Sequence, residues 1–127
     1  MGEPRETAIA KLPDEGELPG ETELPVLSAS THRSAKLVAI FLRHVPIELG
    51  NLESAIVSKD GDQIRHVAHK LKGSCRAVGV LRMAALCDNL ERTWARITDA
   101  PPKHARLVVE YERARTLLEA EHAAPPR

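Results

Sequence analysis

Aromatic residues are almost absent from this sequence. Phe41, Trp94 and Tyr111 are the only three among 127 residues, although 43% of the chain is hydrophobic. A single domain of this length must therefore build its core from Leu, Val, Ile and Ala side chains. Alternating runs of β-branched residues, which indicate strands, are missing as well. The shortage of aromatic residues thus predicts an aliphatic core, and the missing alternation argues against a β-sheet.

Cysteines and long apolar runs are also scarce. Cys75 and Cys87 lie in helical patterns without CxxC or Cys/His ligand spacing, which argues for a reduced, cytosolic protein. No run of 18 apolar residues occurs, and the start MGEPRETAIAKLPDEGE has no hydrophobic region typical of a signal peptide. We therefore expect a cytoplasmic protein without a membrane-spanning segment.

The formal net charge is zero, but the two signs are unevenly distributed. Residues 1–27 contain seven acidic and two basic residues, a net charge of −5, whereas residues 28–127 carry +5. Leu-Pro also recurs at 12–13, 18–19 and 24–25, and each proline opposes a helix. We predict a disordered acidic tail at 1–29, a helical bundle at 30–122 and a short C-terminal tail at 123–127. Alternatively, the acidic tail folds back over the basic face of the bundle.

From Ser30 onward the apolar residues recur with helical spacing. Pro46 is expected to separate the first two helices, and Gly79 to end the third. The predicted helices lie at 31–43, 46–58, 62–78, 80–97 and 102–121. Four amphipathic helices joined by short turns predict an antiparallel up-and-down four-helix bundle, with the helix at 31–43 as an additional N-terminal helix. Such a bundle buries its apolar stripes within one chain, so we expect a monomer.

The stretch HVAHKLKGSC at 66–75 places a glycine inside a predicted helix, where it costs about 1 kcal/mol relative to alanine. Helical geometry puts Gly73 one turn after His69 on the same face, with Lys72 beside them. The opposite, inward stripe consists of Ile64, Val67, Leu71 and Val78. His69 is thus predicted to be exposed, and the glycine is explained by access to its ring. An accessible neutral imidazole is a nucleophile, and a lysine beside it can approach a phosphoryl oxygen.

The segment AHKLKGSCRAVGV at 68–80 resembles the signature of histidine-containing phosphotransfer (HPt) domains, in which AHxLKGSS precedes a glycine-ended helix. The similarity covers about 35–120. It implies that His69 exchanges a phosphoryl group with a receiver-domain aspartate. Lys72 would contact the phosphate, Gly73 would be the small residue, and Glu91 would hydrogen-bond the other imidazole nitrogen. This sequence has Cys75 where serine is common, and Glu91 where some members have glutamine.

The resemblance also implies partners, namely response-regulator receiver domains, a hybrid histidine kinase, or both. The candidate partner-binding residues surround His69 and are Arg65, His66, Ser74 and Arg76. We expect no cofactor or metal on this chain, because Mg²⁺ would belong to the receiver. The sequence has no Gly-rich phosphate loop and no room for an ATP-binding domain, so a phosphotransfer intermediate without kinase activity is predicted.

Three other functions use some of the same residues. A metal site would take His66 and His69 with His44 or His104, although no nearby cysteine or carboxylate completes a ligand set. Nucleic-acid binding lacks aromatic stacking residues and would use the basic side chains of Arg65, Lys72, Arg76 and Arg82. The third possibility is a helical adaptor in which His69 has no chemical role.

Overall fold

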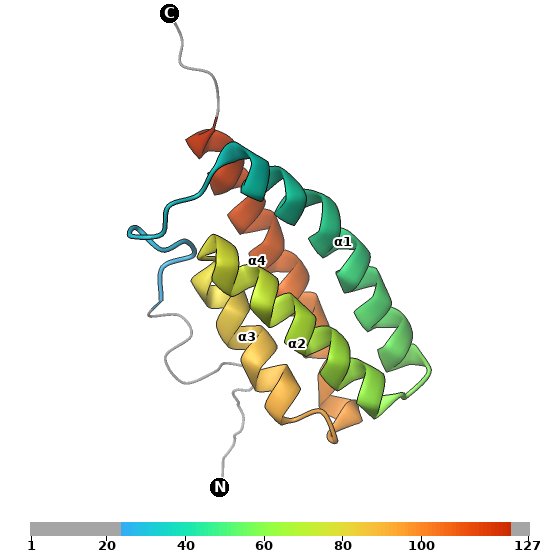
Figure 1. Cartoon of the computed structure of the whole chain (residues 1–127). Helices are drawn as coiled ribbons and strands as arrows, with labels where there is room; N and C mark the ends of the chain where they lie inside the picture. The colour runs from blue at the N-terminus through green and yellow to red at the C-terminus, as the bar shows by residue number, and fades with distance from the viewer. Residues whose placement is uncertain (1–23, 123–127) are drawn as a thin grey trace, which may run out of the picture.

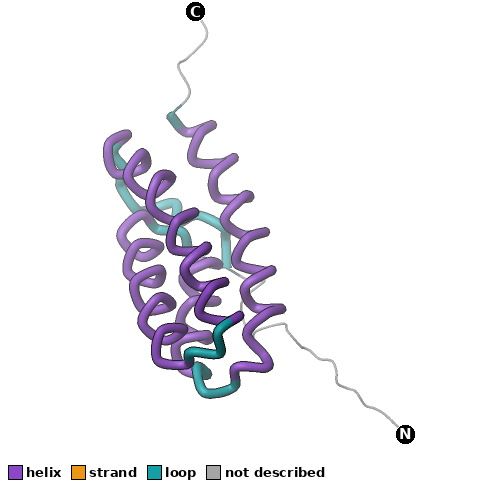
Figure 2. Tube along the Cα trace, turned by 90° about the vertical axis from the view of Figure 1, so that its right-hand side faces the viewer, coloured by secondary structure: helices purple, strands orange, loops and turns teal. Residues whose placement is uncertain are grey.

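The computed structural model describes residues 24–122, and most of this range is helical (Figure 1). The elements are α1 (Ala35–Val57), α2 (Gly61–Val78), α3 (Leu81–Arg92), the short 3-10 helix η2 (Ile97–Asp99) and α4 (Ala100–Glu121). Both α2 and α4 pack against α1 and α3, and the short connections lie at the ends of the bundle (Figure 2). The predicted all-α class is confirmed, because the described range contains no strand, only an isolated bridge between Leu27 and Val80.

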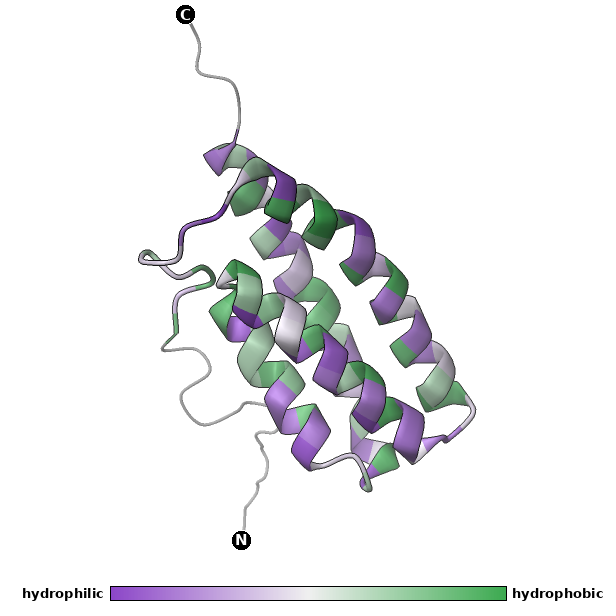
Figure 3. Ribbon diagram, in the orientation of Figure 1, coloured by the Kyte–Doolittle hydropathy of each residue, from purple (hydrophilic) through white to green (hydrophobic). Residues whose placement is uncertain are grey.

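The core is aliphatic, as the shortage of aromatic residues predicts. Its largest fully buried side chains come from all four long helices, among them Leu52, Ile64, Leu71, Met83, Leu90, Leu107 and Leu118. Phe41 and Tyr111 are the aromatic members, with ring centroids 6.2 Å apart. Hydrophobic and hydrophilic residues alternate around each helix (Figure 3), as expected of amphipathic helices that share one core.

The predicted break at Pro46 is wrong. Helix α1 continues through Pro46, so the expected helices at 31–43 and 46–58 are one helix, and its N-cap is Ser34. Proline has no N–H to donate to the carbonyl four residues earlier, which is that of Leu42. The hydroxyl of Tyr111 on α4 donates to that carbonyl at 3.2 Å. A contact between helices thus replaces the missing backbone bond, and residues 24–122 contain no additional N-terminal helix.

The predicted limits of the third helix are confirmed by the bounds of α2. The side chain of Asp60 caps its start by accepting a hydrogen bond from the backbone N–H of Gln63 at 3.1 Å. Its end is Gly79, whose φ of 82° is in the left-handed region that favours glycine. A β-carbon on Gly79 would also lie 2.7 Å from Oγ1 of Thr31. This turn sets the direction in which α3 returns along α2.

The predicted helix at 80–97 is too long, because α3 ends at Arg92. The hydroxyl of Thr93 donates to the carbonyl of Asn89 at 2.8 Å, and the chain then turns into η2. Trp94 packs over the start of α2, where a β-carbon at Gly61 would lie 2.8 Å from its ring. The apolar spacing at 80–97 is helical, but the chain leaves the helix before Trp94, and the Trp94 ring packs on α2 instead.

Residues 24–28 pack with the bundle, although the sequence assigns them to the tail. The N–H of Ser28 donates to the carbonyl of Gly79 at 2.7 Å, and the N–H of Leu81 donates to that of Val26 at 2.9 Å. Val26 and Leu27 also contact the core. Residues 1–23 of the predicted acidic tail and the C-terminal residues 123–127 lie outside the described residues. None of the helices between residues 24 and 122 is long and apolar enough to cross a membrane.

Candidate functional site

His69 lies on the outward face of α2, as predicted, and its side chain is 67% exposed. The opposite side of the helix is anchored in the core by Ile64, Val67, Ala68, Leu71, Cys75 and Val78. This burial determines the rotation of α2 about its own axis. The amphipathic pattern of the helix therefore presents the imidazole to solvent.

Glu91 on α3 holds one nitrogen of the His69 ring. The distance from Nδ1 of His69 to Oε2 of Glu91 is 2.9 Å. The pKa of Glu91 is below its ordinary value because of the hydrogen bond from Lys72 and, to a smaller extent, the one from His69, so the carboxyl group is ionised at neutral pH. An ionised carboxylate only accepts hydrogen bonds, so Nδ1 must be the donor. In the neutral ring the lone pair is therefore on Nε2.

Lys72 is engaged by two carboxylates of α3. Its Nζ lies 2.7 Å from Oε1 of Glu91 and 3.3 Å from Oδ1 of Asp88, and its side chain is only 15% exposed. These partners raise the pKa of Lys72, Glu91 more than Asp88, so the ammonium is charged at neutral pH. The sequence predicts a lysine directed at a group on His69. In the structure the ammonium instead contacts the carboxylate that also holds the ring.

Gly73 is exposed on α2, one turn after His69. A β-carbon built on Gly73 meets no atom within 4 Å. Packing among residues 24–122 therefore does not require a glycine here, in contrast to Gly79, where a β-carbon would contact Thr31. The open space beside the ring is in keeping with the interpretation that Gly73 leaves room for a partner.

Two of the predicted partner-binding residues share a recess with His69. Arg65 and His66 line it together with Asp62 and Glu91, and its volume is about 230 Å³. The guanidinium of Arg65 lies 5.3 Å from the centroid of the Trp94 ring, within the range of a cation–π contact. Arg65 also pairs with Asp62 at 3.8 Å. Its charge is thus held at the edge of the recess.

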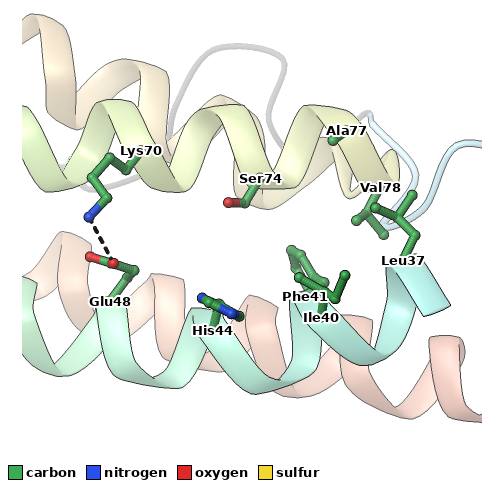
Figure 4. Close-up of a pocket in the computed structure, with 9 residues that line it drawn as sticks. All are labelled: Leu37, Ile40, Phe41, His44, Glu48, Lys70, Ser74, Ala77 and Val78. Carbon is green, nitrogen blue, oxygen red and sulfur yellow. Dashed lines mark ion pairs between the residues drawn. The ribbon is translucent and has the colours of Figure 1, made fainter.

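The other two predicted residues lie elsewhere on α2. Ser74 lines an apolar groove of about 240 Å³ between α1 and α2, opposite His44 (Figure 4). Across the same groove, Lys70 pairs with Glu48 at 3.0 Å. Arg76 is exposed in the last turn of α2. Ser74 therefore faces the α1 side of the helix rather than the recess at His69.

The sequence interpretation missed Asp88 and Trp94. Asp88 lies three residues before Glu91, so helical spacing places both on one face of α3. That spacing was a usable signal. The position of Trp94 depends on the turn after Arg92, which the helical pattern did not reveal.

The residues proposed for a metal site do not come together. Among the residues that the structure describes, no three His, Cys, Asp or Glu side chains are grouped as metal ligands would be. Nε2 of His104 donates to the carbonyl of Leu49 at 3.0 Å. The basic residues proposed for nucleic-acid binding are also partly engaged, since Nε of Arg82 donates to the carbonyl of Leu24 at 2.6 Å and Lys72 contacts two carboxylates.

The family model of the Hpt domain matches residues 36–123, which include His69, Glu91 and nearly all of the described bundle. The chain belongs to the Hpt domain family. Comparisons with curated proteins and with solved structures gave no match. Hpt domains act in phosphotransfer in two-component signalling, where they interact with receiver domains and kinases. Phosphotransfer is therefore the role of this domain, and the resemblance noted in the sequence is confirmed.

Proposed function

We propose that Nε2 of His69 carries the phosphoryl group and exchanges it with the aspartate of a receiver domain. The observation that carries this proposal is the exposed imidazole whose Nδ1 is held by Glu91 at 2.9 Å. This contact leaves the lone pair of the neutral ring on Nε2. The open space beside Gly73 gives a partner room to approach.

In the transfer, Nε2 attacks the phosphorus of an aspartyl phosphate. The Nε2–P bond forms, the P–O bond to the aspartate breaks, and the aspartate leaves as a carboxylate. The imidazole becomes cationic as it gives up its lone pair, and the carboxylate of Glu91 compensates this charge through the Nδ1–H hydrogen bond. The receiver would supply the aspartate and Mg²⁺, while this chain supplies the nucleophile and its orientation.

The recess and the two flanks of α2 suggest how a receiver would dock. Arg65 and His66 border the ring on one side, and Gly73 leaves the next turn open. We propose that Arg65 and Arg76 face acidic or polar groups of the receiver, and that Ser74 lies at the border of the contact. We take a monomer as the acting unit, because all four helices share one core within a single chain.

Replacing His69 by Gln tests the proposal. Incubation with a phosphorylated receiver domain should label the wild type and leave His69→Gln at background. The helicity and unfolding midpoint should stay close to wild type, because an exposed side chain away from the core contributes little to stability. The label should be lost in acid and retained in base, as expected of a phosphorus–nitrogen bond.

His66→Gln is the matched control, because His66 is an exposed histidine one turn earlier on the same helix. It keeps the proposed acceptor, so it should still become labelled. Undiminished labelling of His69→Gln would contradict the assignment. Loss of the label in His66→Gln alone would move the acceptor to that residue.

A further inference from the structure

Asp88 connects two cations near the His69 site, and the proposed function gives it no role so far. It lies on α3 one turn before Glu91. Oδ1 of Asp88 is 3.3 Å from Nζ of Lys72, and its Oδ2 is 2.9 Å from Nε of Arg92. Lys72 in turn contacts Glu91, which holds His69. Asp88, Lys72, Glu91 and His69 thus form a continuous chain of polar contacts across the α2–α3 interface.

We propose that Asp88 is a positioning residue for Lys72, which keeps the ammonium on α3 and so limits its attraction for the phosphoryl group on His69. The inference rests on the proposed function, since it concerns the stability of the phosphorylated state. Asp88 acts here through Lys72 and not by contact with the reacting atoms.

The argument begins with the competition for one ammonium group. Before transfer, Lys72 is shared between the carboxylates of Glu91 and Asp88. A phosphoryl group on Nε2 adds negative charge on the same face, and Lys72 is the cation that already shares Glu91 with the ring. To reach a phosphoryl oxygen, Lys72 must loosen one of its present contacts. Asp88 accepts a hydrogen bond from Lys72 at 3.3 Å, so it competes with a phosphoryl oxygen for the same ammonium group.

The local charges point in the same direction. The charged groups of α3 that face Lys72 are Asp88 and Glu91, and Arg92 lies behind Asp88. Asp88 therefore neutralises positive charge beside the phosphoryl site. Without its carboxylate, Lys72 and Arg92 would both lose a partner, and the potential at the site would become more positive. Lys72 and Arg92 would then attract the dianionic phosphoryl group on His69 more strongly.

Asp88→Asn should lengthen the lifetime of the phosphohistidine. The expected change is about two- to fivefold, the range for breaking an ion pair that is partly open to solvent. Asp88→Glu should have a phosphohistidine lifetime close to that of the wild type, because a glutamate carboxylate can still hold the ammonium of Lys72.

The experiment uses phosphoramidate, a small phosphoryl donor that needs no receiver domain. Its P–N bond breaks, ammonia leaves, and the Nε2–P bond forms on His69. After removal of the donor, the decay of the phosphohistidine is followed by phosphorus NMR at constant pH in the full-length chain. Glu48→Gln is the matched control, because Glu48 also holds a lysine of α2 across a helix interface, at 3.0 Å, but contacts Lys70 instead. Its decay rate should equal that of the wild type.

A second measurement separates positioning from general destabilisation. The titration of Lys72, followed by NMR, should move to lower pH in Asp88→Asn, because Asp88 is one of the groups that raise its pKa. Glu48→Gln should leave that titration unchanged. Equal phosphohistidine lifetimes in the wild type and Asp88→Asn, with phosphohistidine formed in both, would overturn the inference about Asp88 and leave the proposed function standing. Absence of phosphohistidine in the wild type would overturn the proposed function and this inference with it.

Discussion

The α2–α3 pair and the α1–α4 pair are held together by different kinds of polar contact. Between α2 and α3, side chains pair with side chains, as in the contacts of His69 and Lys72 with Glu91. Between α1 and α4, side chains of α4 donate to backbone carbonyls of α1, from Tyr111 to Leu42 and from His104 to Leu49.

This difference has a physical consequence. A contact to a backbone carbonyl fixes the path of a helix, because the carbonyl cannot move without bending that helix. Ion pairs between long side chains can exchange partners by rotamer changes while the backbone stays in place. The α1–α4 pair is thus suited to act as the scaffold. The α2–α3 pair is suited to a site whose charge changes with phosphorylation.

The largest expected effect concerns Pro46 in the α1–α4 pair. Pro46→Ala restores the N–H that can bond the carbonyl of Leu42, and it should stabilise the protein by up to about 3 kcal/mol, the usual cost of proline in a helix interior. Urea unfolding would measure the change. An unchanged free energy of unfolding would show that the contact with Tyr111 offsets the cost of Pro46 completely, and a lower one would contradict the expected stabilisation.

Tyr111→Phe completes this test as a double-mutant cycle. In the wild-type background it should cost about 1–2 kcal/mol, because it leaves the carbonyl of Leu42 without a donor. In the Pro46→Ala background the cost should be clearly smaller, since the restored N–H satisfies the same carbonyl. Equal costs in the two backgrounds would refute the compensation between Tyr111 and Pro46.

In the α2–α3 pair, the turn at Gly79 should be the most sensitive backbone position. Gly79→Ala should destabilise the protein by about 2 kcal/mol, because a left-handed conformation disfavours a β-carbon. The added carbon would also crowd Thr31. Gly50→Ala is the control, since a β-carbon at Gly50 in α1 meets no atom within 4 Å. A thermal shift of the same sign in both variants would contradict this account.

Gly73→Ala should separate stability from function in the α2–α3 pair. Alanine favours a helix over glycine by about 0.5–1 kcal/mol, and the structure offers open space for its methyl group. Gly73→Ala and Gly50→Ala should therefore stabilise the protein to a similar extent. Only Gly73→Ala should slow phosphoryl transfer from a receiver, by up to about a hundredfold if the methyl group displaces the reacting atoms by about 1 Å. Equal transfer rates in both variants would remove the steric explanation of Gly73.

The smallest expected effect is the response of the two pairs to acid. The pKa values of Glu91 and Asp88 lie below their ordinary values of 4.5 and 3.8, Glu91 chiefly because of Lys72 and Asp88 chiefly because of Arg92. A carboxyl group whose pKa is lowered in the folded state stabilises the protein at pH values above its ordinary pKa. This stabilisation is lost as the pH falls through the folded-state pKa. The α2–α3 contacts should therefore loosen below about pH 4, each at a cost of no more than about 1 kcal/mol.

NMR of the carboxyl groups between neutral pH and about pH 2 would follow their protonation. The free energy of unfolding over the same range would be compared between the wild type and Glu91→Gln. The wild type should lose more stability in acid than Glu91→Gln does. The hydrogen bond from Tyr111 to the carbonyl of Leu42 should persist over the same pH range. Burial raises the pKa of the Tyr111 hydroxyl, so the hydroxyl keeps its proton throughout this range. An identical acid response of the wild type and Glu91→Gln would mean that the Glu91 contacts add nothing to stability.

Much of α2 and of the site was predictable from the sequence because its signals are local. The apolar stripe of α2 predicted the exposure of His69, and Gly79 predicted the end of the helix, since its left-handed turn needs a residue without a β-carbon. The contact between Glu91 and His69 was expected only through the family resemblance. The engagement of Lys72 by Asp88 was not expected, because it depends on how two helices are rotated against each other.

By itself, the sequence determined the helical class, the aliphatic core and the face of α2 that carries His69. These follow from the spacing of apolar residues and from the conformational limits of single residues, which act over one or two turns. Only the tertiary structure decided that α1 continues through Pro46, that α3 stops before Trp94, and that Lys72 contacts carboxylates of α3. In each case a partner distant in the chain supplies the hydrogen bond, the packing surface or the charge that outweighs the local preference.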